Sequence, residues 1–121
     1  MSRILVVEDE PGLQQLYKLE LEEIGHEVRL CSDGEQAVKA AHDDLFDLVV
    51  LDIKLPKMEG TEVLHEIKKQ HRGIPVILNS AYATYKADFA NWLADAYVVK
   101  SADLTELKTQ IESLLAAGRA S

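Results

Sequence analysis

Carboxylates, a hydroxyl and an ammonium group follow four short apolar runs of this chain. Glu8 and Asp9 come after the first run, Asp52 after a later one, and Ser80 and Lys100 close two more. Three carboxylates held close together would repel one another and raise one another's pKa unless a cation lies between them. If folding brings these positions together, the chemistry that they favour is the binding of a cation.

The ligand types at this predicted site favour a hard divalent cation. Carboxylate oxygens and a free backbone carbonyl suit Mg2+, which keeps several waters and prefers octahedral geometry, or Mn2+. Zinc is not expected, because the four histidines fall on predicted strand, helix and loop positions without the spacing of zinc ligands. These histidines are His26, His42, His65 and His71.

The polar residues can converge only if strands and helices alternate along the chain. Short apolar runs predict strands at 4–7, 47–51, 76–78 and 96–99, and apolar residues that alternate with charged ones predict a strand at 27–31. Apolar residues near 3.6-residue spacing predict helices at about 11–25, 33–42, 61–72 and 84–93, and from Asp103 onward. This alternation is typical of an α/β domain whose parallel sheet is covered by helices on both faces. Ligands of such sheets bind beyond the carboxyl ends of the strands, where all five polar residues would lie.

Local signals mark the ends of several predicted helices. Pro11 occupies a first helical position, where its missing N–H costs nothing. Ser32 and Asp33 are the predicted caps of the second helix, and Asp103 and Glu106 form a pair similar to a capping box. Gly25 is the expected stop of the first helix.

Composition limits the classes of protein that remain. The chain has 121 residues, 47% of them apolar, and only three prolines, which indicates one soluble globular domain. Its formal net charge of -8 argues against binding to nucleic-acid phosphates. No segment approaches the roughly 20 apolar residues of a membrane span, and the single Cys31 agrees with a reducing compartment. We therefore expect a cytoplasmic protein without membrane contact, with one domain at 1–117 and a tail or linker at 118–121.

The chain resembles a response-regulator receiver domain of the CheY-like family, which serves two-component phosphorelays. The resemblance covers essentially the whole chain. It rests on four motifs: the acidic pair in ILVVEDE, the Asp in LVVLDIKLPKMEG, the hydroxyl residue in VILNSA and the Lys in YVVKS. It implies a doubly wound, flavodoxin/CheY-like parallel sheet of five strands in the order 2-1-3-4-5, with five helices on both faces. It also implies a signalling domain and not an enzyme, with at most slow self-phosphorylation and self-dephosphorylation.

The resemblance implies that Asp52 is the phosphoacceptor, whose carboxylate attacks the phosphorus of a kinase phosphohistidine. Carboxylate nucleophiles of this kind are a known form of covalent catalysis. Asp9, Asp52 and the backbone carbonyl of Lys54 are the implied Mg2+ ligands, and Glu8 would act through a water. Such a metal draws charge from the transferring phosphoryl group.

The remaining site residues would respond to the phosphoryl group. Lys100 is expected to pair with Asp52 beforehand and then to meet a phosphoryl oxygen, and Ser80 to donate its hydroxyl as a switch residue. Tyr97 matches the aromatic residue whose rotamer reports on that movement. Lys54 and Tyr82 match positions that influence the lifetime of the phosphoryl group, and their size predicts slow self-dephosphorylation.

The implied partners are a histidine kinase or phosphotransfer protein on one side and an output domain or target protein on the other. Phosphorylation would shift the population between two conformations. The surface that changes would comprise 84–93, 96–99 and the helix from Asp103, and this surface also allows a dimer. The sequence names neither the kinase nor the output.

Two departures from the family pattern lie between Ser80 and Ser101. Ser101 follows Lys100, where family members usually have proline after a cis peptide, and a cis bond without proline costs roughly 2.5 to 4 kcal/mol. The interval from Ser80 to Lys100 is also shorter than expected, so the helix at 84–93 is expected to be short or displaced. A receiver-like interaction module that works without phosphorylation therefore stays open as an alternative.

Two further classes of protein agree less well with the residues at the predicted site. A flavodoxin-like cofactor binder needs a phosphate loop after the first strand, where Glu8 and Asp9 would repel a phosphate. A phosphatase of the haloacid dehalogenase type needs a second acid two residues after the nucleophile. In this chain that position, two residues after Asp52, is occupied by Lys54.

Overall fold

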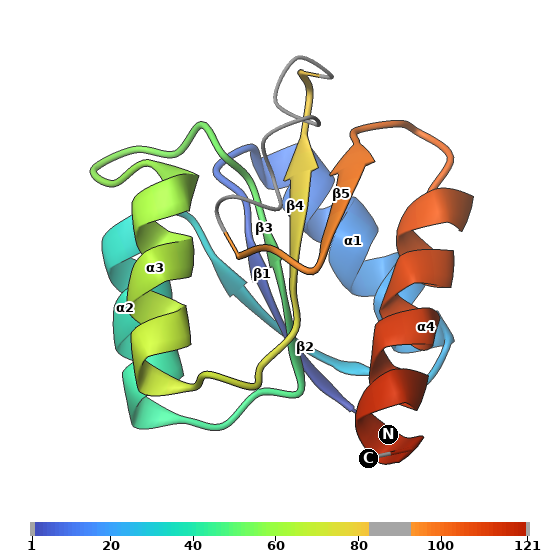
Figure 1. The fold of residues 1–121 in the computed structure, drawn as a ribbon. Coiled ribbons are helices and arrows are strands. Elements are labelled where there is room, and N and C mark those ends of the chain that lie inside the picture. Colours follow the sequence, from blue (N-terminus) through green and yellow to red (C-terminus); the bar gives the residue numbers. More distant parts are fainter. Residues whose placement is uncertain (1, 83–92, 121) are drawn as a thin grey trace.

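Five parallel strands form the centre of the molecule in a computed structural model that describes residues 2–82 and 93–120 (Figure 1). The strands are β1 (Arg3–Val7), β2 (Glu27–Cys31), β3 (Leu48–Leu51), β4 (Val76–Ser80) and β5 (Ala96–Val99). They pair in the order β2-β1-β3-β4-β5, and each pairing is parallel. The predicted fold class and strand order are confirmed.

Two layers of helices cover the two faces of this sheet. The helices of the described residues are α1 (Pro11–Glu23), α2 (Gly34–Asp43), α3 (Gly60–Gln70) and α4 (Thr105–Ala120). Figure 1 shows α2 and α3 on one face and α1 and α4 on the other. The described part of the chain thus contains four helices where five were expected. The expected helix at 84–93 lies outside the described residues except for Leu93, which is part of a turn.

Side chains cap the first two helices. α1 begins at Pro11 as predicted, and the preceding Glu10 accepts hydrogen bonds from the backbone N–H groups of Gly12 and Leu13. Asp33 caps α2 by accepting from Gln36 N at 2.9 Å. These bonds satisfy N–H groups that have no partner inside a helix.

The last helix begins later and ends later than the sequence predicts. Asp103 accepts hydrogen bonds from both the backbone N–H and the hydroxyl of Thr105. Regular α4 starts at Thr105 and not at Asp103, and the Asp103 side chain satisfies a backbone N–H group at this end of the helix. α4 continues to Ala120, so its last turn includes the start of the predicted tail at 118–121.

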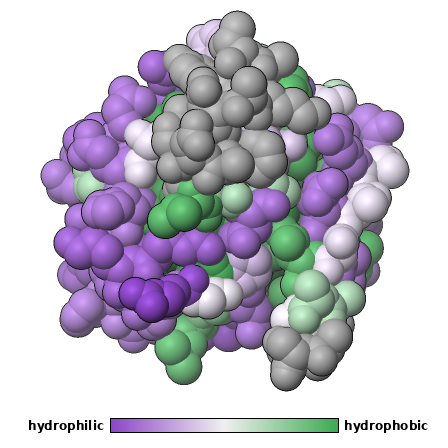
Figure 2. Space-filling model, in the orientation of Figure 1, coloured by the Kyte–Doolittle hydropathy of each residue, from purple (hydrophilic) through white to green (hydrophobic). Residues whose placement is uncertain are grey.

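The inner strands β1, β3 and β4 carry runs of consecutive apolar residues because helices cover both faces of the sheet, whereas the edge strand β2 alternates buried and exposed residues. Leu5 and Val7 belong to the apolar cluster shared with α2 and α3, whereas Ile4 and Val6 belong to the one shared with α1 and α4. This alternation produces the continuous apolar runs of the sequence. Figure 2 shows that the face turned to the viewer is mostly hydrophilic, with small separate apolar areas. Among the described helices, none is both long and apolar enough to cross a membrane.

Candidate functional site

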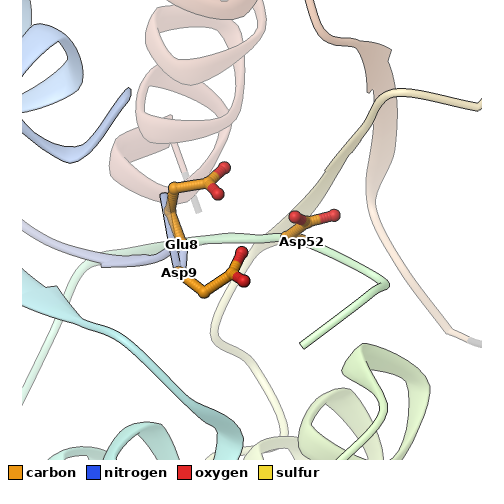
Figure 3. Close-up of side chains that lie close together, drawn as sticks. All are labelled: Glu8, Asp9 and Asp52. Atoms are coloured by element: carbon orange, nitrogen blue, oxygen red, sulfur yellow. The ribbon is translucent and has the colours of Figure 1, made fainter. Parts of the chain in front are cut away.

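Three carboxylates converge at the carboxyl edge of the sheet. Glu8 and Asp9 follow β1, and Asp52 follows β3 (Figure 3). Each offers an oxygen that lies within 4.8 Å of the others. Glu8 and Asp52 are buried, with exposed fractions of 2% and 6%, and Asp9 is exposed. The cluster is therefore open to solvent on the side of Asp9.

The ladder of the sheet extends beyond the strands and fixes two of these acids. Asp52 N donates to Val7 O at 3.1 Å, and Glu8 N donates to Cys31 O at 3.0 Å. These bonds continue the β1–β3 and β1–β2 pairings by one residue. Glu8 and Asp52 are consequently held side by side by backbone geometry.

The ammonium group of Lys100 lies between the two buried acids. Its Nζ is 2.8 Å from Asp52 Oδ2 and 2.6 Å from Glu8 Oε1. Lys100 follows β5, and its backbone N donates to Ser80 O at 2.7 Å, which continues the β4–β5 ladder. Every peptide bond of the described residues is trans, including Lys100–Ser101. Lys100 therefore reaches the acids without the cis peptide that is usual in the resembled family.

Burial and pairing act in opposite directions on the charges at this site. Burial alone would lower the pKa of Lys100, but its hydrogen bonds and attraction to Asp52 and Glu8 prevail and raise the pKa to about 12. Burial raises the pKa of Glu8, and its bonds to Lys100 and to the N–H of Glu10 offset only part of this rise. The ammonium is thus firmly charged, while Glu8 is a weaker acid than an exposed glutamate.

The donor atoms of the acidic cluster fit a small hard cation. With Mg–O bonds of about 2.1 Å, opposite ligands of an octahedral Mg2+ are about 4.2 Å apart. One carboxylate oxygen each of Glu8, Asp9 and Asp52 lies within 4.8 Å of the other two, so the cluster is of a size that such an ion can span. Lys54 lies beside them, since its backbone N–H donates to Asp52 Oδ1 at 3.3 Å. A site made only of oxygen donors suits Mg2+ or Mn2+.

Ser80 and Tyr97 are both bonded to the segment that follows β4. Ser80 is fully buried, and its Oγ accepts a hydrogen bond from Tyr82 N at 3.2 Å. Tyr97 on β5 is 4% exposed and donates its hydroxyl to the carbonyl of Tyr82. The Tyr82 side chain itself is half exposed. The start of this segment is therefore linked to both predicted switch residues.

Two polar contacts near the site are not among the predictions from the sequence. Gln14 of α1 donates from Nε2 to Glu8 O at 2.5 Å, and no sequence signal distinguishes it from other polar helix residues. Asn79 of β4 donates from Nδ2 to the hydroxyl of Tyr17 at 2.9 Å. The signal for Asn79 was available, because it is a polar residue inside an apolar strand.

Comparison with known proteins gives one consistent family. A sequence profile of the response regulator receiver domain matches residues 4–112. The response regulator ArlR of Staphylococcus saprophyticus is 36% identical over 117 residues, which make up 95% of this chain and 53% of ArlR. The chain spans about half the length of the curated relatives that it matches.

Solved structures of similar length share both sequence and fold with the chain. TrrA of Thermotoga maritima, in complex with Mg2+-BeF, is 45% identical with a TM-score of 0.89, over 94% of this chain and 99% of TrrA. TrrA has also been solved with the histidine kinase ThkA. A CheY-like receiver domain protein from Methanospirillum hungatei is 31% identical with a TM-score of 0.93, over 99% of this chain and 98% of that protein.

Proposed function

This chain belongs to the response regulator receiver domain family, and from that premise we propose that Asp52 accepts a phosphoryl group from a histidine kinase. One observation carries the proposal. Asp52 is a buried carboxylate that lies beside two further acids and beside the ammonium of Lys100. A lone acid that caps a turn needs none of these neighbours.

The transfer forms one bond and breaks one bond. An oxygen of Asp52 attacks the phosphorus of a phosphohistidine, the P–N bond breaks, and its electron pair returns to the imidazole. The product is an acyl phosphate on Asp52. Mg2+, held by Asp9, Asp52 and the Lys54 carbonyl with Glu8 acting through water, would withdraw charge from the phosphoryl group. The three clustered carboxylates support this assignment.

Lys100 and Ser80 would then bind the new phosphoryl oxygens. Lys100 is positioned for this exchange, because its ammonium already contacts the oxygen of Asp52 at 2.8 Å. Ser80 would exchange the N–H of Tyr82 for the phosphoryl group, and this would move the segment to which Tyr97 is bonded. The exchange would shift the population between two conformations of the surface around β5 and α4. Lys54 and Tyr82 are proposed to slow the hydrolysis of the acyl phosphate.

The proposed donor is a histidine kinase or a phosphotransfer protein in the cytoplasm, and the proposed recipient of the signal is an output domain or target protein. The complex between TrrA and ThkA supports the first partner. The relatives of about twice the length support the second. The surface around β5 and α4 is also the proposed dimer contact.

Substitution of Asp52 tests the proposal directly. The chain is incubated with Mg2+ and acetyl phosphate, and intact mass is measured for wild type, Asp52→Asn and the matched control Asp43→Asn, an exposed acid at the end of α2. We expect one added phosphoryl group on wild type and on the control, and none on Asp52→Asn. An adduct that survives Asp52→Asn would refute the assignment of the acceptor. A wild-type chain that takes no adduct would favour an interaction module without phosphorylation.

A further inference from the structure

A buried hydrogen bond joins α1 to β4 near the carboxyl end of that strand. Asn79 Nδ2 donates to the hydroxyl of Tyr17 at 2.9 Å. The two residues are 4% and 1% exposed. They are 62 positions apart in the sequence, so only the tertiary fold brings them together.

This pair lies in a layer that is otherwise apolar. Alternation along β4 turns Ile77 and Asn79 to the same face of the sheet, and Ile77 belongs to the apolar cluster of α1 and α4 together with Tyr17 and Val98. An apolar residue at position 79 would fill this layer without needing a partner. A buried polar pair that is satisfied holds its two elements in one arrangement, because any other arrangement leaves polar groups unpaired.

The pair is one residue away from the predicted switch. Asn79 pairs with Val98 across the ladder, and Ser80 is paired with Val99. Because successive residues of a strand point to opposite faces, Ser80 points away from Tyr17. The charged groups of the acidic site also act on Tyr17. Burial raises the pKa of Tyr17, and the charges of Lys100, Glu8 and Asp52 all act on its hydroxyl.

We propose that Asn79 and Tyr17 are positioning residues for phosphoryl binding, which fix the rotation of the end of β4 so that Ser80 faces the phosphoryl group. The proposal rests on the proposed function, since it assigns Ser80 a contact with that group. Neither Asn79 nor Tyr17 touches the reacting atoms. They act through the peptide unit that joins Asn79 to Ser80.

Two substitutions remove the bond in different ways. Tyr17→Phe keeps the ring in the core and removes only the hydroxyl, whereas Asn79→Val replaces the amide by a branched apolar side chain. We expect each to weaken Mg2+-dependent binding of beryllofluoride, a phosphoryl mimic, by roughly five- to tenfold, the size of one buried hydrogen bond. Binding of Mg2+ alone should be unchanged, because its proposed carboxylate ligands follow β1 and β3.

Isothermal titration calorimetry on the full chain measures both affinities. The series comprises wild type, Tyr17→Phe, Asn79→Val, the double variant and the control Ile77→Val, which trims the same face of β4 without touching the hydrogen bond. The double variant should bind beryllofluoride about as weakly as either single variant, because both remove the same bond. Ile77→Val should bind it like wild type.

Three results would overturn the positioning role: wild-type affinity for beryllofluoride in Tyr17→Phe, losses that multiply in the double variant, or an equal loss of Mg2+ affinity. Each of these requires that wild type itself binds beryllofluoride. A wild type that does not bind it would refute the proposed function and, with it, the assignment of Asn79 and Tyr17.

Discussion

Lys100 is the residue on which the charge balance of the site depends. It neutralises part of the charge of Glu8 and Asp52, which are otherwise two buried acids next to each other. A buried charge that loses its partner is costly, whereas an exposed ion pair contributes little. The Lys100 side chain is only 17% exposed, so we expect its ion pairs with Glu8 and Asp52 to contribute more to stability than exposed ion pairs do.

Lys100→Met should therefore destabilise the metal-free chain. The pKa of Lys100 is raised from 10.5 to about 12, which corresponds to about 2 kcal/mol of folding free energy. A raised lysine pKa stabilises the fold fully below pH 10.5 and loses this effect as pH rises toward 12. Urea unfolding should show a deficit of about 2 kcal/mol for Lys100→Met at pH 8, shrinking between pH 10.5 and 12.

Lys69→Met is the matched control for this measurement. Lys69 is 61% exposed and lies 3.7 Å from Glu66 on the same helix. We expect a change of less than about 0.5 kcal/mol at any pH. A deficit for Lys100→Met that persists unchanged at pH 12 would show that lost packing and not lost charge is responsible.

The connection from β3 to α3 determines how Asp52 is presented. Its end is closed by Gly60 N, which donates to Ile53 O at 2.7 Å. A Cβ atom at Gly60 would lie 2.1 Å from Asp52 O and 2.7 Å from Ile53 Cα. Both are backbone atoms of the site and cannot move aside cheaply. Glycine is thus required as the first residue of α3, because the helix starts in contact with the backbone that follows β3.

Gly60→Ala should destabilise the chain by about 1 to 3 kcal/mol, the usual cost of overpacking, and should weaken adduct formation on Asp52. Gly73→Ala is the control, because a Cβ there meets no atom within 4 Å. We expect that control to be neutral or slightly stabilising. Urea unfolding curves of the two variants compare them, and equal stability would contradict the close approach at Gly60.

The whole molecule carries a net charge of -8, and its three clustered acids concentrate part of that charge at one edge of the sheet. Repulsion among these acids opposes folding when no cation is present. A ligand that binds only the folded state stabilises it by mass action. The stability of the domain should therefore depend on divalent cations.

Mg2+ at one hundred times its dissociation constant should stabilise wild type by about 2.7 kcal/mol. Asp9→Asn removes one acid, so this variant should be more stable than wild type in EDTA and less stable in Mg2+. Urea unfolding with and without Mg2+ measures this reversal. Glu23→Gln, an exposed acid at the end of α1, should respond to Mg2+ like wild type. The same response in Asp9→Asn would contradict a metal site at Asp9.

Local sequence signals determined the elements and their order. Apolar runs, helical spacing and the signals at Pro11 and Asp33 act between near neighbours, so they could be recognised without a structure. The regular part of α4 begins at Thr105 and not at Asp103, although Asp103 does bond a backbone N–H group at this end as a capping residue would.

The sequence also determined which edge of the sheet carries the acids, Ser80 and Lys100, because parallel strands bring their carboxyl ends together. Only the tertiary structure decided how these side chains are paired. In the structure, Lys100 forms ion pairs with both Glu8 and Asp52. Asn79 is hydrogen-bonded to Tyr17, and Gly60 packs against the backbone of Asp52. The physical reason is that side-chain partners depend on rotamers and on packing between distant segments, and neither leaves a periodic signal in the chain.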